Sequence, residues 1–146
     1  MATPAPDYDR DFYAWAIHNA ELIRQGRLAE LDLEHLAEEV ESMGVSQRHE
    51  LKNRIRVLLL HLLKWQFQPQ ARSSGWVGTI DEQRARLDLL LEESPSLRRL
   101  LDEAIGYAYP WARQAAGRET GLSVDVFPNR CPYTAEQALN VDFWPH

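Results

Sequence analysis

Apolar residues recur every three or four positions along most of this chain, which is the spacing of amphipathic α-helices. The pattern predicts five main helices, over about residues 8–25, 33–43 and 47–68, then from a start between residues 73 and 79 to about residue 92, and over about residues 95–120. Pro110 is expected to kink or break the fifth helix, because proline cannot donate the backbone hydrogen bond there. With short connections favouring antiparallel neighbours, the sequence predicts an all-α bundle.

A glycine and a serine divide the middle of the chain. Gly44 is expected to end the second helix, because glycine is the usual residue just past a helix C-terminus. Ser46 is expected to cap the third and longest helix. If these two helices pack antiparallel, the acidic residues before Gly44 come alongside the basic residues after Ser46.

The length of 146 residues favours one domain, over residues 1–146. We expect about residues 1–6 to be flexible and about residues 122–146 to form an irregular tail. Apolar side chains in that tail suggest that it wraps onto the body of the protein: Phe127, Tyr133, Leu139, Phe143 and Trp144. Thr134 and Gln137 have the spacing of a capping box and predict a short last helix ending near Asn140.

The net charge of −6 is distributed unevenly along the chain. It is −7 over residues 1–47, +5 over residues 48–86 and −4 over residues 87–146. The acidic balance argues against general nucleic-acid binding, while the basic middle leaves room for a local anion site. Cys131 is the only cysteine, and no apolar run reaches the ~20 residues of a membrane span. A cytoplasmic protein is therefore expected.

The first candidate site combines His35, Glu38 and Glu39 of the second helix with His61 of the third. Histidine and carboxylate side chains at i, i+3 and i+4 suit a divalent metal, or general acid–base work by His61 and Glu39. The alternative is an ordinary charged face. In that case the acidic side chains pair with bases of the next helix. The acids are Glu34, Glu38, Glu39 and Glu41, and the bases are Arg48, Lys52, Arg54 and Arg56.

The second candidate site is the segment from His61 to Trp76, where cations and indoles alternate. Its proposed ligand-binding residues are Lys64, Trp65, Arg72, Trp76 and the later Arg84. Guanidinium and ammonium groups bind phosphates or carboxylates, and an indole can stack on a ring. The alternative is structural, with the tryptophans anchoring the loop and the cations stacking on them or capping carbonyls.

Several motifs in this order resemble a known family. They are YDRDFYAW, RQGRLAELDLEHLAEEVESMG, LLLHLLKWQFQP, FPNRCPY and VDFWP. The chain resembles, over essentially its whole length, the bacterial domain-of-unknown-function family numbered twenty-nine. The resemblance implies an all-helical, single-domain bacterial protein of the cytosol, and it implies no reaction.

Three functional hypotheses follow. The first is a binding or regulatory module that acts on a protein partner, or on a small anionic ligand held in a polar or basic groove. The alternative is a hydrolase or nuclease-like enzyme, in which a divalent metal on the His/Glu cluster works with the basic loop. The third is a homo-oligomer, formed through the aromatic residues Tyr8, Phe12, Tyr13 and Trp15.

Overall fold

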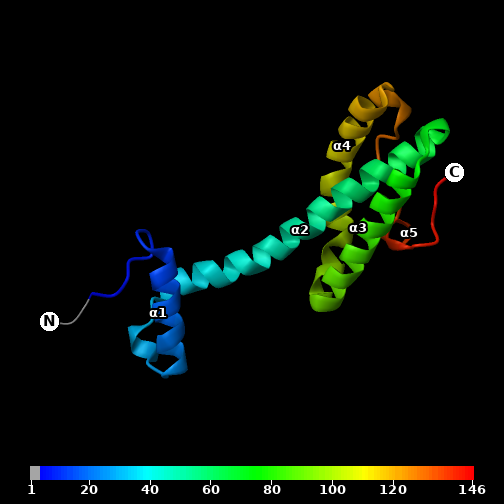
Figure 1. Cartoon of the computed structure of the whole chain (residues 1–146). Coiled ribbons are helices and arrows are strands. Elements are labelled where there is room, and N and C mark those ends of the chain that lie inside the picture. Colours follow the sequence, from blue (N-terminus) through cyan, green and yellow to red (C-terminus); the bar gives the residue numbers. More distant parts are fainter. Residues whose placement is uncertain (1–3) are drawn as a thin grey trace. The chain divides into compact units, whose positions relative to one another are not determined.

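The computed structural model describes residues 4–146, and over these residues the protein is all-α with no β-strand. Helices account for 76% of the structure, which confirms the expected fold class. Figure 1 shows four long helices and a short last one. They are α1 (Phe12–Arg24), α2 (Leu33–Phe67), α3 (Ser74–Glu93), α4 (Leu101–Thr120) and α5 (Ala135–Leu139). Short 3₁₀ turns lie between them: η1 (Leu28–Glu30), η2 (Pro69–Ala71), η3 (Pro95–Leu100) and η4 (Val124–Val126).

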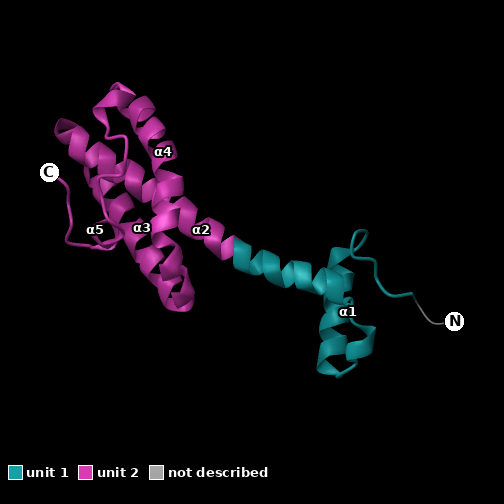
Figure 2. Ribbon diagram, turned by 180° about the vertical axis from the view of Figure 1, so that it is seen from behind, with its two compact units in different colours: residues 1–45 teal, residues 46–146 magenta. Residues whose placement is uncertain are grey.

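The chain forms two compact units, residues 1–45 and residues 46–146 (Figure 2). One domain over the whole chain stays a prediction. The expected flexible N-terminus falls partly on residues 1–3, which lie outside the described residues.

The predicted break at Gly44 and Ser46 is wrong, because residues 33–67 form one continuous α-helix, α2. Gly44 does not adopt the positive φ of a helix-ending glycine, whereas Gly26 and Gly121 do. A glycine inside a helix costs only about 1 kcal/mol relative to alanine. No proline lies between residues 33 and 67 to enforce a stop. The antiparallel hairpin expected from the sequence is therefore absent.

The first unit is small and has few buried side chains. Asp11 caps α1 by accepting a hydrogen bond from the amide of Ala14. In α1 only Trp15, Asn19 and Leu22 are buried. The residues of α2 that belong to this unit include none that is buried.

The second unit holds the main hydrophobic core. Its α2 face contributes Leu51, Ile55, Leu58, Leu59, Leu62 and Leu63. Helix α3 adds Ile80, Leu87 and Leu91, and α4 adds Ala104, Ala108, Ala112 and Ala116. Helix α4 continues through Pro110, which lies on its exposed side, so the expected break does not form.

The C-terminal tail wraps onto the second unit, as predicted. Phe127 and Tyr133 are buried, and the tail residues Leu139, Phe143 and Trp144 pack against the core. The predicted capping box is also present, with Thr134 and Gln137 bonded to each other's backbone. Helix caps and buried aromatic rings thus determine where the tail lies.

Candidate functional site

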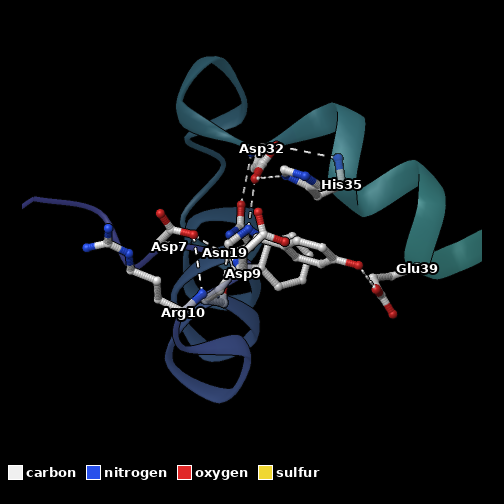
Figure 3. A network of polar contacts seen from close by, with 9 residues as sticks. Asp7, Asp9, Arg10, Asn19, Asp32, His35 and Glu39 are labelled. Carbon is white, nitrogen blue, oxygen red and sulfur yellow. Dashed lines mark hydrogen bonds and ion pairs between the residues drawn. The ribbon is translucent and has the colours of Figure 1, made fainter.

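A polar network in the first unit joins the N-terminal segment, α1 and the start of α2 (Figure 3). The carboxylate of Asp32 is its centre. It accepts hydrogen bonds from the indole Nε1 of Trp15 at 2.9 Å and contacts the Nδ1 atom of His35 at 2.7 Å. Buried Asn19 accepts from the Asp32 amide at 3.0 Å. Asp32 also caps the start of α2, since its carboxylate accepts from the His35 amide.

Tyr8 covers the imidazole of His35 and reaches the candidate residue Glu39. The two rings are stacked with centroids 4.0 Å apart, and the Tyr8 hydroxyl donates to Glu39. This hydrogen bond, helped by partial burial, raises the pKa of Tyr8 to about 12. Glu38 is exposed to solvent. His35 and Glu39 therefore have structural partners in the first unit.

The contact between His35 and Asp32 shifts the pKa values of both side chains. The hydrogen bond to Asp32 raises the pKa of His35 and lowers the pKa of Asp32. The pair therefore stabilises the fold fully only between the ordinary aspartate pKa near 3.8 and the ordinary histidine pKa near 6.5. That stabilisation is lost as the pH rises through the raised pKa of His35. The lowered pKa of Asp32 means that the pair also weakens at low pH, when Asp32 is protonated.

We expect an NMR titration of the whole chain to place the pKa of His35 above 6.5. Asp32→Asn should move it back toward that value, because the amide cannot supply the negative charge. His61 is the internal control. Burial lowers its pKa, and the Asp32 variant should not change it. A His35 pKa at or below 6.5, or one that ignores the substitution, would contradict this network.

The proposed metal set of His35, Glu38, Glu39 and His61 loses its geometric basis. It depended on a hairpin between two helices, and these residues instead follow one another along α2. His61 is half-buried, and its Nδ1 atom contacts the carbonyl oxygen of Val57 at 2.8 Å. Within residues 4–146, no group of three or more His, Cys, Asp or Glu side chains is arranged to hold a metal ion.

The basic, tryptophan-rich segment is brought together with other parts of the second unit, as the structural alternative predicted. Lys64 is buried, pairs with Glu119 at 3.2 Å and lies over the ring of Trp76 at 5.0 Å. Arg72 lies over the ring of Trp65 at 4.6 Å and donates to the Trp65 carbonyl at 2.9 Å. The cations thus stack on the indoles and cap a carbonyl.

Arg84 holds the C-terminal tail. It is 1% exposed and donates from Nε to the Ala138 carbonyl and from Nη2 to the Phe143 carbonyl, both at 2.8 Å. Trp144 lies between two of the candidate residues, 4.8 Å from the Trp65 ring and 5.4 Å from the Arg84 guanidinium. We call Trp65, Arg72 and Arg84 the tail clamp.

A polar surface that the sequence analysis did not single out lies on the second unit. A cavity of about 170 Å³ is lined by His49, Lys52, Asn53, Arg56 and Tyr107. Lys52 lies over the Tyr107 ring at 4.3 Å, and Arg56 lies over the Trp111 ring at 4.1 Å. The lining contains no carboxylate, so this surface attracts negative charge. A signal in the sequence was available, because Arg48, Lys52 and Arg56 recur every four residues.

The first unit exposes much of its apolar surface. Among residues 4–146, thirteen large hydrophobic side chains are exposed, and eight of them belong to this small unit. They are Phe12, Tyr13, Ile17, Ile23, Leu28, Leu33, Val40 and Met43. Trp15, in contrast, is buried and Tyr8 is partly covered, so they are not part of this surface.

The helices and surfaces described above define a small all-α protein built from two helical units. The chain belongs to the family described as Domain of unknown function DUF29, whose sequence model matches residues 8–144. Membership of the family that the motifs resemble is thereby confirmed. Comparison with curated proteins and with solved structures finds no match. Within residues 4–146, no helix is long and apolar enough to cross a membrane.

Proposed function

We propose that this chain is a protein-binding module whose first unit recognises an α-helix with one apolar face and basic residues beside it. One observation carries the proposal. Helix α2 repeats the same 4-3-4 spacing of small and apolar residues 18 positions, or five helical turns, apart. In the C-terminal repeat of the pattern, Leu51, Ile55, Leu58 and Leu62 are buried in the core. In the N-terminal repeat, Leu33, Ala37, Val40 and Gly44 are exposed.

We call these four exposed residues the open stripe. Leu33 is 67% exposed and Val40 is 61% exposed, and neighbouring Met43 is 64% exposed. Leaving such side chains in water forfeits about 1.5–3 kcal/mol each compared with full burial. Apolar positions at heptad spacing are the usual seat for a second helix. The small residues Ala37 and Gly44 would allow that helix to approach closely.

The charge beside the open stripe supports a basic partner. Glu34, Glu38 and Glu41 lie along the same stretch of α2 and are exposed, and we call them the acidic stripe. Among the described residues, none of the three forms an ion pair. A helix carrying lysine or arginine beside its apolar face would complement them. We place this binding in the cytoplasm, as the lone cysteine leads us to expect.

The earlier alternatives have less support. A small anion at the tryptophan-rich segment would compete with the existing partners of Lys64, Arg72 and Arg84. A metal-dependent hydrolase would need the hairpin that α2 does not form. Binding of a partner helix requires neither the loss of those contacts nor a hairpin in α2.

Fluorescence anisotropy with two labelled amphipathic peptide helices tests the proposal. The peptides share an apolar face, and one has lysine flanks while the other has glutamate flanks. We expect the whole chain to bind the lysine peptide at least about tenfold more tightly, or by 1.4 kcal/mol. Leu33→Ser combined with Val40→Ser should abolish binding, whereas the matched control Leu89→Ser, at an exposed leucine of α3, should not. Equal binding of both peptides, or binding that survives the double variant, would overturn the proposal.

A further inference from the structure

We infer that the partner surface is supplied by a second copy of this chain, whose α2 provides the basic residues and whose α4 provides the apolar area, and that the two copies form a dimer through α2. This inference rests on the proposed function and identifies its partner. The acidic stripe of one copy docks on basic residues of the other copy, and the open stripe beside it covers exposed aromatic rings there. The same contacts occur twice in one closed pair.

The receiving surface belongs to the second unit. Arg48, Lys52 and Arg56 lie four residues apart on α2, and we call them the basic stripe. Among residues 4–146, none of the three pairs with a carboxylate. Like charges at i and i+4 repel each other within a helix. A row of carboxylates brought alongside would relieve that repulsion.

Exposed aromatic rings lie beside the basic stripe. Five large hydrophobic side chains are exposed in the second unit: Leu89, Tyr107, Trp111, Val126 and Val141. Of these, the rings of Tyr107 and Trp111 are the two over which Lys52 and Arg56 lie. Tyr107 is 63% exposed and Trp111 is 40% exposed. The surface thus combines positive charge with apolar area, which matches the combination of negative charge and apolar area on residues 33–44.

The spacing of the charges fits an antiparallel pair. Four residues of α-helix rise about 6 Å, so carboxylates and cations that recur every three or four residues stay aligned along two helices. An antiparallel arrangement places Glu34 opposite Arg56 of the second copy. The same register places Glu38 opposite Lys52, and it places Glu41 one residue away from the position opposite Arg48. Each copy then satisfies both of its charged stripes at once.

The second copy of the chain also provides the pairing of acidic and basic residues that the sequence led us to expect within one chain. The acidic and basic residues of α2 were expected to face each other across a hairpin within one chain. Because α2 is continuous, its acidic and basic parts follow one another along the same helix. A second, antiparallel α2 provides the facing charges that the hairpin would have provided. A lysine-flanked peptide would mimic the basic stripe of that second copy.

Sedimentation velocity of the whole chain and of two charge-reversed variants tests this inference. In the first variant Glu34, Glu38 and Glu41 become lysine, and in the second Arg48, Lys52 and Arg56 become glutamate. We expect the unaltered chain to be a dimer that dissociates with added salt. Each variant alone should associate about a hundredfold more weakly, since three attractive pairs become repulsive in each half of the dimer, or six in all. An equimolar mixture of the two variants should form a heterodimer, because every facing pair then joins a basic and an acidic residue.

Two exposed acids of α3 provide the matched control. Asp88→Lys with Glu92→Lys should leave the dimer intact. Circular dichroism confirms that each variant stays helical. A monomeric unaltered chain, or a mixture that stays monomeric, would overturn the inference. If the chain is a monomer and still binds the lysine peptide, only the second copy as partner is wrong and the binding module stands. If it neither dimerises nor binds the peptide, both proposals fail.

Discussion

Arg84→Ala is expected to destabilise the second unit by about 3 kcal/mol, as measured by urea denaturation. The substitution removes two hydrogen bonds from a charged donor to tail carbonyls, each worth about 1.5–3 kcal/mol. It also leaves a cavity at a position that is 1% exposed. Part of this loss is offset, because burial disfavours the charged guanidinium and lowers the pKa of Arg84. The Nη1 atom, buried without a hydrogen-bond partner, adds to that offset.

Two further variants separate the causes of this loss. Arg84→Met keeps most of the volume and removes both the charge and the unpartnered Nη1 atom, so we expect a loss of about 1–2 kcal/mol. Arg72→Ala is the matched control for a clamp arginine at the surface. Its contact with the Pro145 carbonyl is long, at 3.4 Å, and the loss should stay near 1 kcal/mol. Equal losses for Arg84→Ala and Arg72→Ala would contradict the clamp as described.

Trp65→Ala is expected to cost about 3 kcal/mol, the lower end of the range for removing a large aromatic side chain from a core. Trp65 is half-buried against the core, and its ring contacts Trp144 of the tail and Arg72. Its removal should therefore also loosen residues 138–145, which limited proteolysis would detect as earlier cleavage of the tail.

The matched control is Trp111→Ala, which removes the same side chain from an exposed position on α4. That variant should lose about 1 kcal/mol or less, because its ring is held mainly by Arg56. If the two tryptophan variants unfold at the same urea concentration, Trp65 does not anchor the tail.

Short-range signals in the sequence predicted much of the fold. The Thr134–Gln137 capping box involves residues three positions apart, and it is present. The tail was predicted to pack against the body of the protein because it carries several large apolar side chains within a short irregular segment. Gly44 misled the prediction, because glycine at a helix end and glycine inside a helix look alike until the backbone angle is known.

The candidate sites depended on contacts between distant residues, which spacing alone could not provide. Lys64 and Glu119 are 55 positions apart, and Arg84 and Ala138 are 54 apart. Nothing local marks these cations as structural. The open stripe was different, since its spacing repeats after exactly five turns of α2. The spacing is visible in the sequence, but only the structure shows that its second occurrence is buried and its first is exposed.

Amide hydrogen exchange along α2 tests the central claim, which is that residues 33–44 form the binding face. We expect exchange at residues 33–44 to slow when the lysine-flanked peptide is added in excess to the whole chain, diluted until it no longer self-associates. Exchange at residues 61–76 should stay unchanged, because the cations of this segment, Lys64 and Arg72, already have partners. Slowing confined to residues 61–76 would contradict the account and would return the binding site to the tryptophan-rich segment.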